Sequence, residues 1–107
     1  MSKLVRLWTD EAGRSQFAEG HIDLPPTAVT TIHAEETAAH RALDWHVAPS
    51  RQYVVTLTGT LRFTTRDGGT FVLAPGDVLL AEDTAGSGHR WELIDDQPWR
   101  RLYVQLA

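Results

Sequence analysis

Two residues that lie two positions apart, Asp44 and His46, are the strongest chemical candidates in the sequence. In an extended strand, residues i and i+2 project from the same side, with their Cβ atoms about 7 Å apart. A carboxylate and an imidazole placed in this way can bind one divalent cation together. Without a metal, the same pair can serve as acid and base. We therefore predict a catalytic role for both residues and expect Trp45 on the opposite face.

Three further residues are expected at the same site. Gln52 begins the next expected strand, and its amide oxygen is a weak metal ligand or a hydrogen-bond partner. Trp91 shares a strand face with His89 and would form an aromatic wall. Gln52 and Trp91 are predicted to contact a ligand. The predicted metal ligands are Asp44, His46, Gln52 and His89.

The segment before His89 allows two interpretations. Glu82 and Asp83 are either part of a solvated turn or a general acid or base at the mouth of a pocket. The loop 83–88 contains two glycines, Gly86 and Gly88. They predict a loop that moves to admit a ligand and then excludes water.

Short runs of β-branched and aromatic residues, separated by turn residues, predict an all-β fold. No window shows a sustained apolar repeat at helical spacing, and only 34–42 is a candidate for a single helical turn. The regular spacing of the strands is typical of sandwiches and barrels. We expect one closed or nearly closed barrel around one interior pocket. The expected strands are 3–8, 15–24, 27–33, 41–46, 52–58, 60–65, 70–73, 78–82, 89–94 and 99–106.

The strand 52–58 has two different faces. Gln52, Val54, Thr56 and Thr58 make one face semi-polar, which suits a pocket with a few polar groups among apolar walls. The opposite face carries Tyr53, Val55 and Leu57 and is fully apolar. Such a face is usually covered, so we predict a homodimer, with the N-terminal strands of 1–33 as candidates for the contact. The alternative is a monomer whose own N-terminal strand covers this face. In 99–106, the apolar face of Leu102, Val104 and Leu106 is expected in the core.

The order of these motifs resembles the cupin superfamily, and more narrowly a group of short single-domain bacterial cupins. The first cupin motif has two histidines one residue apart, then a glutamate, six residues and a glycine; here 44–46 precede Gln52, and six residues separate Gln52 from Gly59. The second motif matches Pro75-Gly76-Asp77, the strand 78–82 and His89. The resemblance covers 43–93. It implies an antiparallel jelly-roll barrel, with residues 1–107 as one domain.

The chain departs from the cupin pattern at two of the four ligand positions. Asp44 replaces the first histidine, and Gln52 replaces the glutamate. A carboxylate binds metals strongly, whereas an amide binds them weakly. The resemblance implies a divalent metal as cofactor, with iron, manganese, nickel and zinc as the candidates. Two histidines and one carboxylate are also the ligand set of non-haem iron oxygenases.

Composition excludes several classes of function. The formal net charge of -4 argues against a nucleic-acid partner, which would need a basic face. The absence of cysteine excludes disulfides, thiolate catalysis and cysteine zinc sites. No apolar run approaches the length needed to span a membrane, and charges interrupt 1–13, so we expect neither a membrane span nor a signal peptide. A cytoplasmic location is the resulting expectation.

Two classes of function remain open. In the first, the protein is a small-molecule enzyme that catalyses isomerisation, elimination, cyclisation or dioxygenation, with or without a metal. In the second, the pocket only binds or senses a small molecule. Clustered ionisable groups in a pocket are costly unless they are used, which favours the enzyme.

Overall fold

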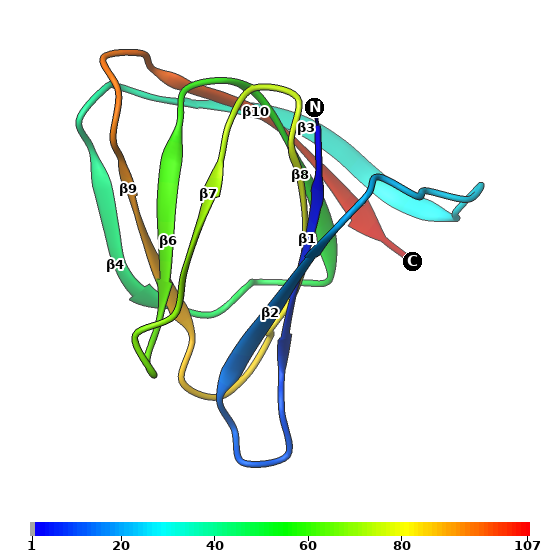
Figure 1. Cartoon of the computed structure of the whole chain (residues 1–107). Coiled ribbons are helices and arrows are strands. Elements are labelled where there is room, and N and C mark those ends of the chain that lie inside the picture. Colours follow the sequence, from blue (N-terminus) through cyan, green and yellow to red (C-terminus); the bar gives the residue numbers. More distant parts are fainter. Residues whose placement is uncertain (1) are drawn as a thin grey trace.

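Ten β-strands form two sheets that face one another (Figure 1). The computed structural model describes residues 2–107, so Met1, the first residue of the expected domain, lies outside the described residues. No residue in 2–107 is helical; the helical turn considered for 34–42 is absent because β3 continues to Thr37. The strands are β1 (Leu4–Thr9), β2 (Ser15–Gly20), β3 (Val29–Thr37), β4 (Ala42–His46), β5 (Gln52–Thr58), β6 (Leu61–Thr65), β7 (Thr70–Leu73), β8 (Val78–Glu82), β9 (His89–Leu93) and β10 (Trp99–Leu106).

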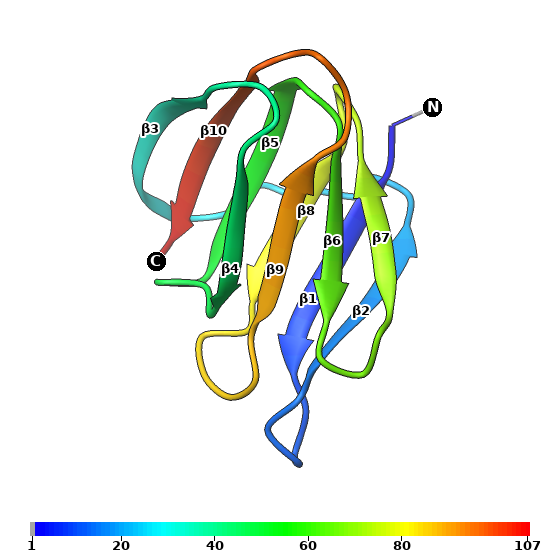
Figure 2. The same ribbon diagram turned by 90° about the vertical axis from the view of Figure 1, so that its left-hand side faces the viewer.

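One sheet has six strands in the order β2-β1-β8-β5-β10-β3, and the other has four in the order β4-β9-β6-β7 (Figure 2). Neighbouring strands are antiparallel, except that β1 pairs with β8 in parallel. The N-terminal strand β1 therefore lies within the six-stranded sheet, between β2 and β8, and does not cover its outer face. In the part of the chain that the structure describes, no helix is long and apolar enough to cross a membrane.

The core lies between the two sheets and is built by strict alternation along the strands. In β6, Leu61, Phe63 and Thr65 are buried, whereas Arg62 is exposed. Phe63 stacks on Phe71 of β7 with ring centroids 4.9 Å apart. Fully burying a side chain of this kind contributes about 1.5–3 kcal/mol to folding. The two sheets are therefore held together largely by apolar side chains around one central cluster.

The expectation that Leu102, Val104 and Leu106 lie in the core is wrong. The inward residues of β10 are Trp99, Arg101, Tyr103 and Gln105, which line a cavity between the sheets. The apolar residues of β10 lie on the outer face of the six-stranded sheet, where Val104 pairs with Tyr53, and Leu102 with Val55. In β10 the more apolar side chains do not mark the buried face, because the inner wall of this sheet is partly polar.

The outer face of β5, β10 and β3 is consequently rich in exposed apolar side chains. The side that carries Tyr53, Val55 and Leu57 points away from the cavity, as the alternation of β5 predicted. Leu57 is 49% exposed and Ile32 of β3 is 64% exposed. Among the described residues, no element packs over this face, since β1 and β2 lie in the plane of the same sheet.

Candidate functional site

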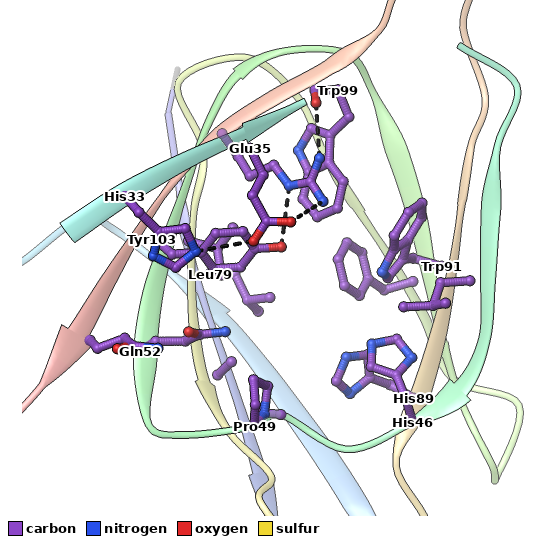
Figure 3. Close-up of a pocket in the computed structure, with 17 residues that line it drawn as sticks. His33, Glu35, His46, Pro49, Gln52, Leu79, His89, Trp91, Trp99 and Tyr103 are labelled. Carbon is purple, nitrogen blue, oxygen red and sulfur yellow. Dashed lines mark hydrogen bonds and ion pairs between the residues drawn. The ribbon is translucent and has the colours of Figure 1, made fainter. Parts of the chain in front are cut away.

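A cavity of about 450 Å³ opens between the two sheets (Figure 3). Its size lies within the range of small-molecule pockets, and much of its wall is apolar, as is usual for such pockets. Phe63, Leu79, Trp91 and Trp99 form these walls. Polar side chains gather at two separate places in Figure 3: the pair His46 and His89 on one side, and a group with Glu35 and Tyr103 on the other.

The histidine pair consists of His46 of β4 and His89 of β9. The two residues are direct partners in the antiparallel ladder between these strands, so their side chains share one face of the sheet. Their ring centroids are 4.4 Å apart, and the rings are inclined by 63°. The prediction that both residues line one pocket is confirmed by their place in the cavity wall.

The ring nitrogens of the two histidines are arranged in the same way. Nδ1 of His46 donates to the carbonyl oxygen of Asp44 over 2.7 Å, and Nδ1 of His89 donates to Oδ2 of Asp83 over 2.6 Å. An oxygen acceptor at Nδ1 fixes the tautomer and the orientation of an imidazole ring. Nε2 of each ring is therefore the nitrogen left to interact with a molecule in the cavity.

Asp44 does not join His46 in the cavity. The ladder between β4 and β9 pairs Leu43 with Trp91 and His46 with His89, so β4 contains one more residue than β9 between these pairs. This β-bulge changes the alternation: Leu43 and His46 face the cavity, while Asp44 is exposed in an outer groove beside Arg62 and Arg90. The expectation that Asp44 and His46 project side by side is wrong for this reason.

Asp83 supplies the carboxylate near the histidines instead. Its side chain is fully buried, and its Oδ2 accepts hydrogen bonds from His89 and from the hydroxyl of Ser15 at 2.7 Å. Its Oδ1 is buried and has no hydrogen-bond partner among the residues from 2 to 107. Asp83 is thus neither a solvated turn residue nor a group at the pocket mouth. It lies behind His89 and orients the imidazole.

The surroundings of His46 favour its neutral form. Burial lowers the pKa of His46 below its ordinary value of 6.5, and the nearby His89 lowers it further. The hydrogen bond to the Asp44 carbonyl and the charge of Asp83 act in the opposite direction but are outweighed. A neutral imidazole whose Nδ1 carries the proton has a free electron pair at Nε2, so His46 is able to accept a proton from a bound molecule near neutral pH.

The predicted ligand-binding residues Gln52 and Trp91 both line the cavity, and both are buried. Trp91 contacts Trp99 edge to face, with centroids 4.8 Å apart. Gln52 lies across the cavity from the histidine pair in Figure 3. Its predicted pocket position therefore holds, but the structure does not bring it together with His46 and His89 as part of one ligand set.

The four predicted metal ligands are accordingly dispersed. Asp44 lies outside the cavity, Gln52 lies across it, and only His46 and His89 are adjacent. Across residues 2–107, no group of three histidine, cysteine, aspartate or glutamate side chains is placed to hold one ion. Catalytic zinc sites typically provide three protein ligands. The residues present thus offer two imidazole nitrogens, a donor set that does not fit a firmly held metal.

The loop 83–88 is tied to the turn between β1 and β2. The amide of Ser87 donates to the carbonyl of Gly13 over 2.8 Å, and the hydroxyl of Thr9 donates to the carbonyl of Ala85 over 2.9 Å. A Cβ atom at Gly86 would lie 2.2 Å from the carbonyl oxygen of Gly13. These contacts do not support a loop that swings freely, and glycine is needed here for close backbone approach. Glu82 points elsewhere and pairs with Arg6 and Arg51.

The second polar part of the cavity was not predicted from the sequence. Arg101 and Tyr103 of β10 and His33 and Glu35 of β3 line it. The semi-polar alternation Arg101, Tyr103, Gln105 is the signal that could have indicated it, because the inward face of β5 has the same character. The contribution of β3 has no such local signal, since it depends on the pairing of β3 with β10.

Comparison with known proteins gives a structural likeness only. No protein-family model matches the chain, and no curated protein matches it. The crystal structure of the conserved SPY1581 protein of unknown function from Streptococcus pyogenes is similar, with a TM-score of 0.48 and 16% sequence identity over 99% of this chain and 75% of that one. The molecule described here is an all-β protein with two sheets that enclose a cavity lined by a histidine pair.

Proposed function

We propose that this protein is a cupin-type small-molecule enzyme that transfers protons on a substrate held in the cavity. The observation that supports this proposal is the paired arrangement of His46 and His89. Each ring has an oxygen acceptor at Nδ1, which leaves Nε2 for a substrate. Rigid strands hold both rings, and catalysis requires such fixed geometry.

The two histidines differ in a way that suits two roles. His46 is kept neutral by its surroundings and is the candidate general base. Asp83 can accept the Nδ1 hydrogen bond of His89 whether or not Nε2 carries a proton. A protonated His89 can therefore donate a proton at a second position of the substrate, and proton exchange with water then restores both histidines. Isomerisation, elimination and cyclisation are reactions of this kind, and Asp44 takes no part in them.

The cupin-type jelly-roll barrel and the homodimer belong to this proposal as well. The strand order and the positions of Gly59, Pro75-Gly76-Asp77 and His89 support the cupin assignment. Gly59 has a φ of +88°, and a Cβ atom there would lie 2.8 Å from the carbonyl oxygen of Pro98, which accounts for glycine at the end of the first motif. The exposed apolar face that includes Leu57 supports the dimer.

A divalent metal at the histidine pair stays a prediction that can be tested separately. With two imidazole ligands we expect weak binding, which titration with manganese, iron, nickel and zinc measures. A His46→Ala variant should lose it. The proton-transfer proposal does not depend on the result.

Incubation in deuterated water tests the proposed function. A panel of small polar and aromatic metabolites is incubated with the protein, and deuterium incorporation or a new product is followed by NMR and mass spectrometry. His46→Gln should slow the reaction by about 10²–10⁴-fold, the usual contribution of a positioned base. His21→Gln, which changes an exposed histidine outside the cavity, is the matched control. Recovery of every bound compound unchanged and free of deuterium would establish a binding protein instead.

A further inference from the structure

Arg101 is a buried cation in the wall of the cavity. It occupies an inward position of β10 and is 5% exposed. Its guanidinium lies over the ring of Trp99, 3.9 Å from the centroid, and Nη1 donates to the hydroxyl of Thr37 and to the carbonyl of Trp99. Nε donates to the hydroxyl of Tyr103 over 3.2 Å. These contacts fix the plane of the guanidinium.

One nitrogen of this guanidinium, Nη2, takes no part in the contacts above. Nη2 makes none of these hydrogen bonds, and the carboxylate oxygen paired with it, Oε1 of Glu35, is 3.8 Å away. This distance is too long for a hydrogen bond. The hydroxyl of Tyr103 accepts from Nε, so its own hydrogen is available for donation. Nη2 of Arg101 and the hydroxyl of Tyr103 are therefore two donors available in the part of the cavity wall that Glu35 also lines.

Glu35 is a weakly bound partner for Nη2 of Arg101. It lies on β3, an edge strand, and its side chain is 52% exposed. Its other oxygen, Oε2, is 3.0 Å from Nε2 of His33, a side chain that is itself half exposed. Exposed ion pairs contribute little to stability. Glu35 shows that a carboxylate is accommodated next to Arg101, and its exposure allows it to give way to another carboxylate.

We propose that Arg101 and Tyr103 bind the carboxylate of the substrate, which makes the substrate a carboxylic acid. Arginine suits this role because its planar N–H donors match the geometry of a carboxylate. Tyr103 and Glu35 lie apart from His46 and His89 in Figure 3, and the apolar side chains of Trp91, Trp99 and Phe63 line the same cavity. The substrate therefore has a carboxylate at one end and a flat, apolar body that reaches His46. That the other end of the substrate reacts at His46 rests on the proposed function, whereas binding of the carboxylate at Arg101 does not require turnover.

Binding of paired acids and amides tests the proposal. The probes are benzoate, phenylacetate and cinnamate, each compared by calorimetry with its uncharged primary amide. We expect at least one acid to bind at least about tenfold more tightly than its amide, because a charge-assisted hydrogen bond is roughly twice as strong as a neutral one. Equal affinity of every acid and its amide would overturn the proposal, and so would the failure of all three acids to bind.

Three variants locate the binding group. Tyr103→Phe and Arg101→Lys should each weaken binding of the acid by about tenfold, the size of one lost hydrogen bond to a charge. Glu35→Gln should tighten it several-fold because it removes the competing carboxylate; a purely structural pairing of Arg101 with Glu35 would not have this effect. Tyr53→Phe and Glu36→Gln are the matched controls outside the cavity. If Arg101→Lys does not fold, the other two variants decide, and unchanged affinity in both would refute the assignment.

The same assays separate this inference from the proposed function. His46→Gln should slow turnover by about 10²–10⁴-fold, while acids still bind in preference to their amides. Acids that bind through Arg101 but are never converted would disprove the enzyme and keep the carboxylate site. Turnover of uncharged compounds, with no preference for acids, would keep the enzyme and disprove the carboxylate site.

Discussion

Replacement of Asp83 by asparagine should destabilise the protein strongly, although only one non-hydrogen atom changes. The carboxylate accepts two side-chain hydrogen bonds, from Ser15 and His89, in a fully buried position. Hydrogen bonds to charged groups contribute about 1.5–3 kcal/mol each, so about 3–6 kcal/mol is at stake. The asparagine oxygen can take the place of Oδ2 and accept both bonds as neutral ones, about 0.5–1.5 kcal/mol each, but its NH2 group then lies without an acceptor at the buried position of Oδ1. The expected loss in the free energy of unfolding is about 2–5 kcal/mol.

Urea unfolding, followed by tryptophan fluorescence, measures this loss. A decrease of 2 kcal/mol corresponds to a decrease in Tm of about 8 °C or more for a domain of this size. Ser15→Ala should cost less than Asp83→Asn, about 1.5–3 kcal/mol, because the bond between Asp83 and His89 is kept. Asp96→Asn, at a side chain that is 93% exposed, should leave stability unchanged. A stability of Asp83→Asn within about 0.5 kcal/mol of the parent protein would refute the assigned role of Asp83.

Three further predictions follow from the same structure. NMR titration should place the pKa of His46 in the folded protein below 6.5, and His89→Gln should raise this pKa. Between this pKa and 6.5 the unfolded chain binds more protons than the folded one, so the parent protein should lose stability as the pH falls through this range. The loss should disappear in His46→Gln. Gly88→Ala should destabilise the protein more than Gly68→Ala, because both have a positive φ but only at Gly88 would a Cβ atom meet the carbonyl oxygen of His46, at 2.3 Å. Light scattering should give a dimer mass for the parent protein and a monomer mass for Leu57→Lys; a monomeric parent would contradict the proposed dimer.

The strands could be predicted from the sequence largely because turn residues mark their ends. Four expected ranges, 52–58, 70–73, 78–82 and 99–106, agree with the structure to the residue. Glycine, proline and aspartate lie at most of these boundaries, where their local conformational preferences are strong. Such signals act over a few residues and do not depend on the rest of the fold.

The candidate site could be predicted only in part, because side-chain direction depends on pairing. His46, Gln52, His89 and Trp91 were placed correctly in the cavity wall. Asp44 was misplaced because a bulge in β4 depends on its ladder with β9, which no local pattern reveals. Arg101 was missed for a different reason. Hydrophobicity indicates which face is buried only where the interior is apolar, and here the interior holds a partly polar cavity.

The parallel pairing of β1 with β8 also has a consequence for how the chain folds. Leu4 pairs with Val78, and β3 pairs with β10 near the other end of the chain, so the six-stranded sheet depends on contacts between distant segments. Closing such long loops before their contacts form slows folding, typically to milliseconds or seconds for all-β domains. Before β1 pairs with β8, the edge of β8 is exposed, and so is the apolar outer face of the neighbouring strands β5, β10 and β3. Intermediates of this kind tend to aggregate, so the yield on refolding should fall as the protein concentration rises.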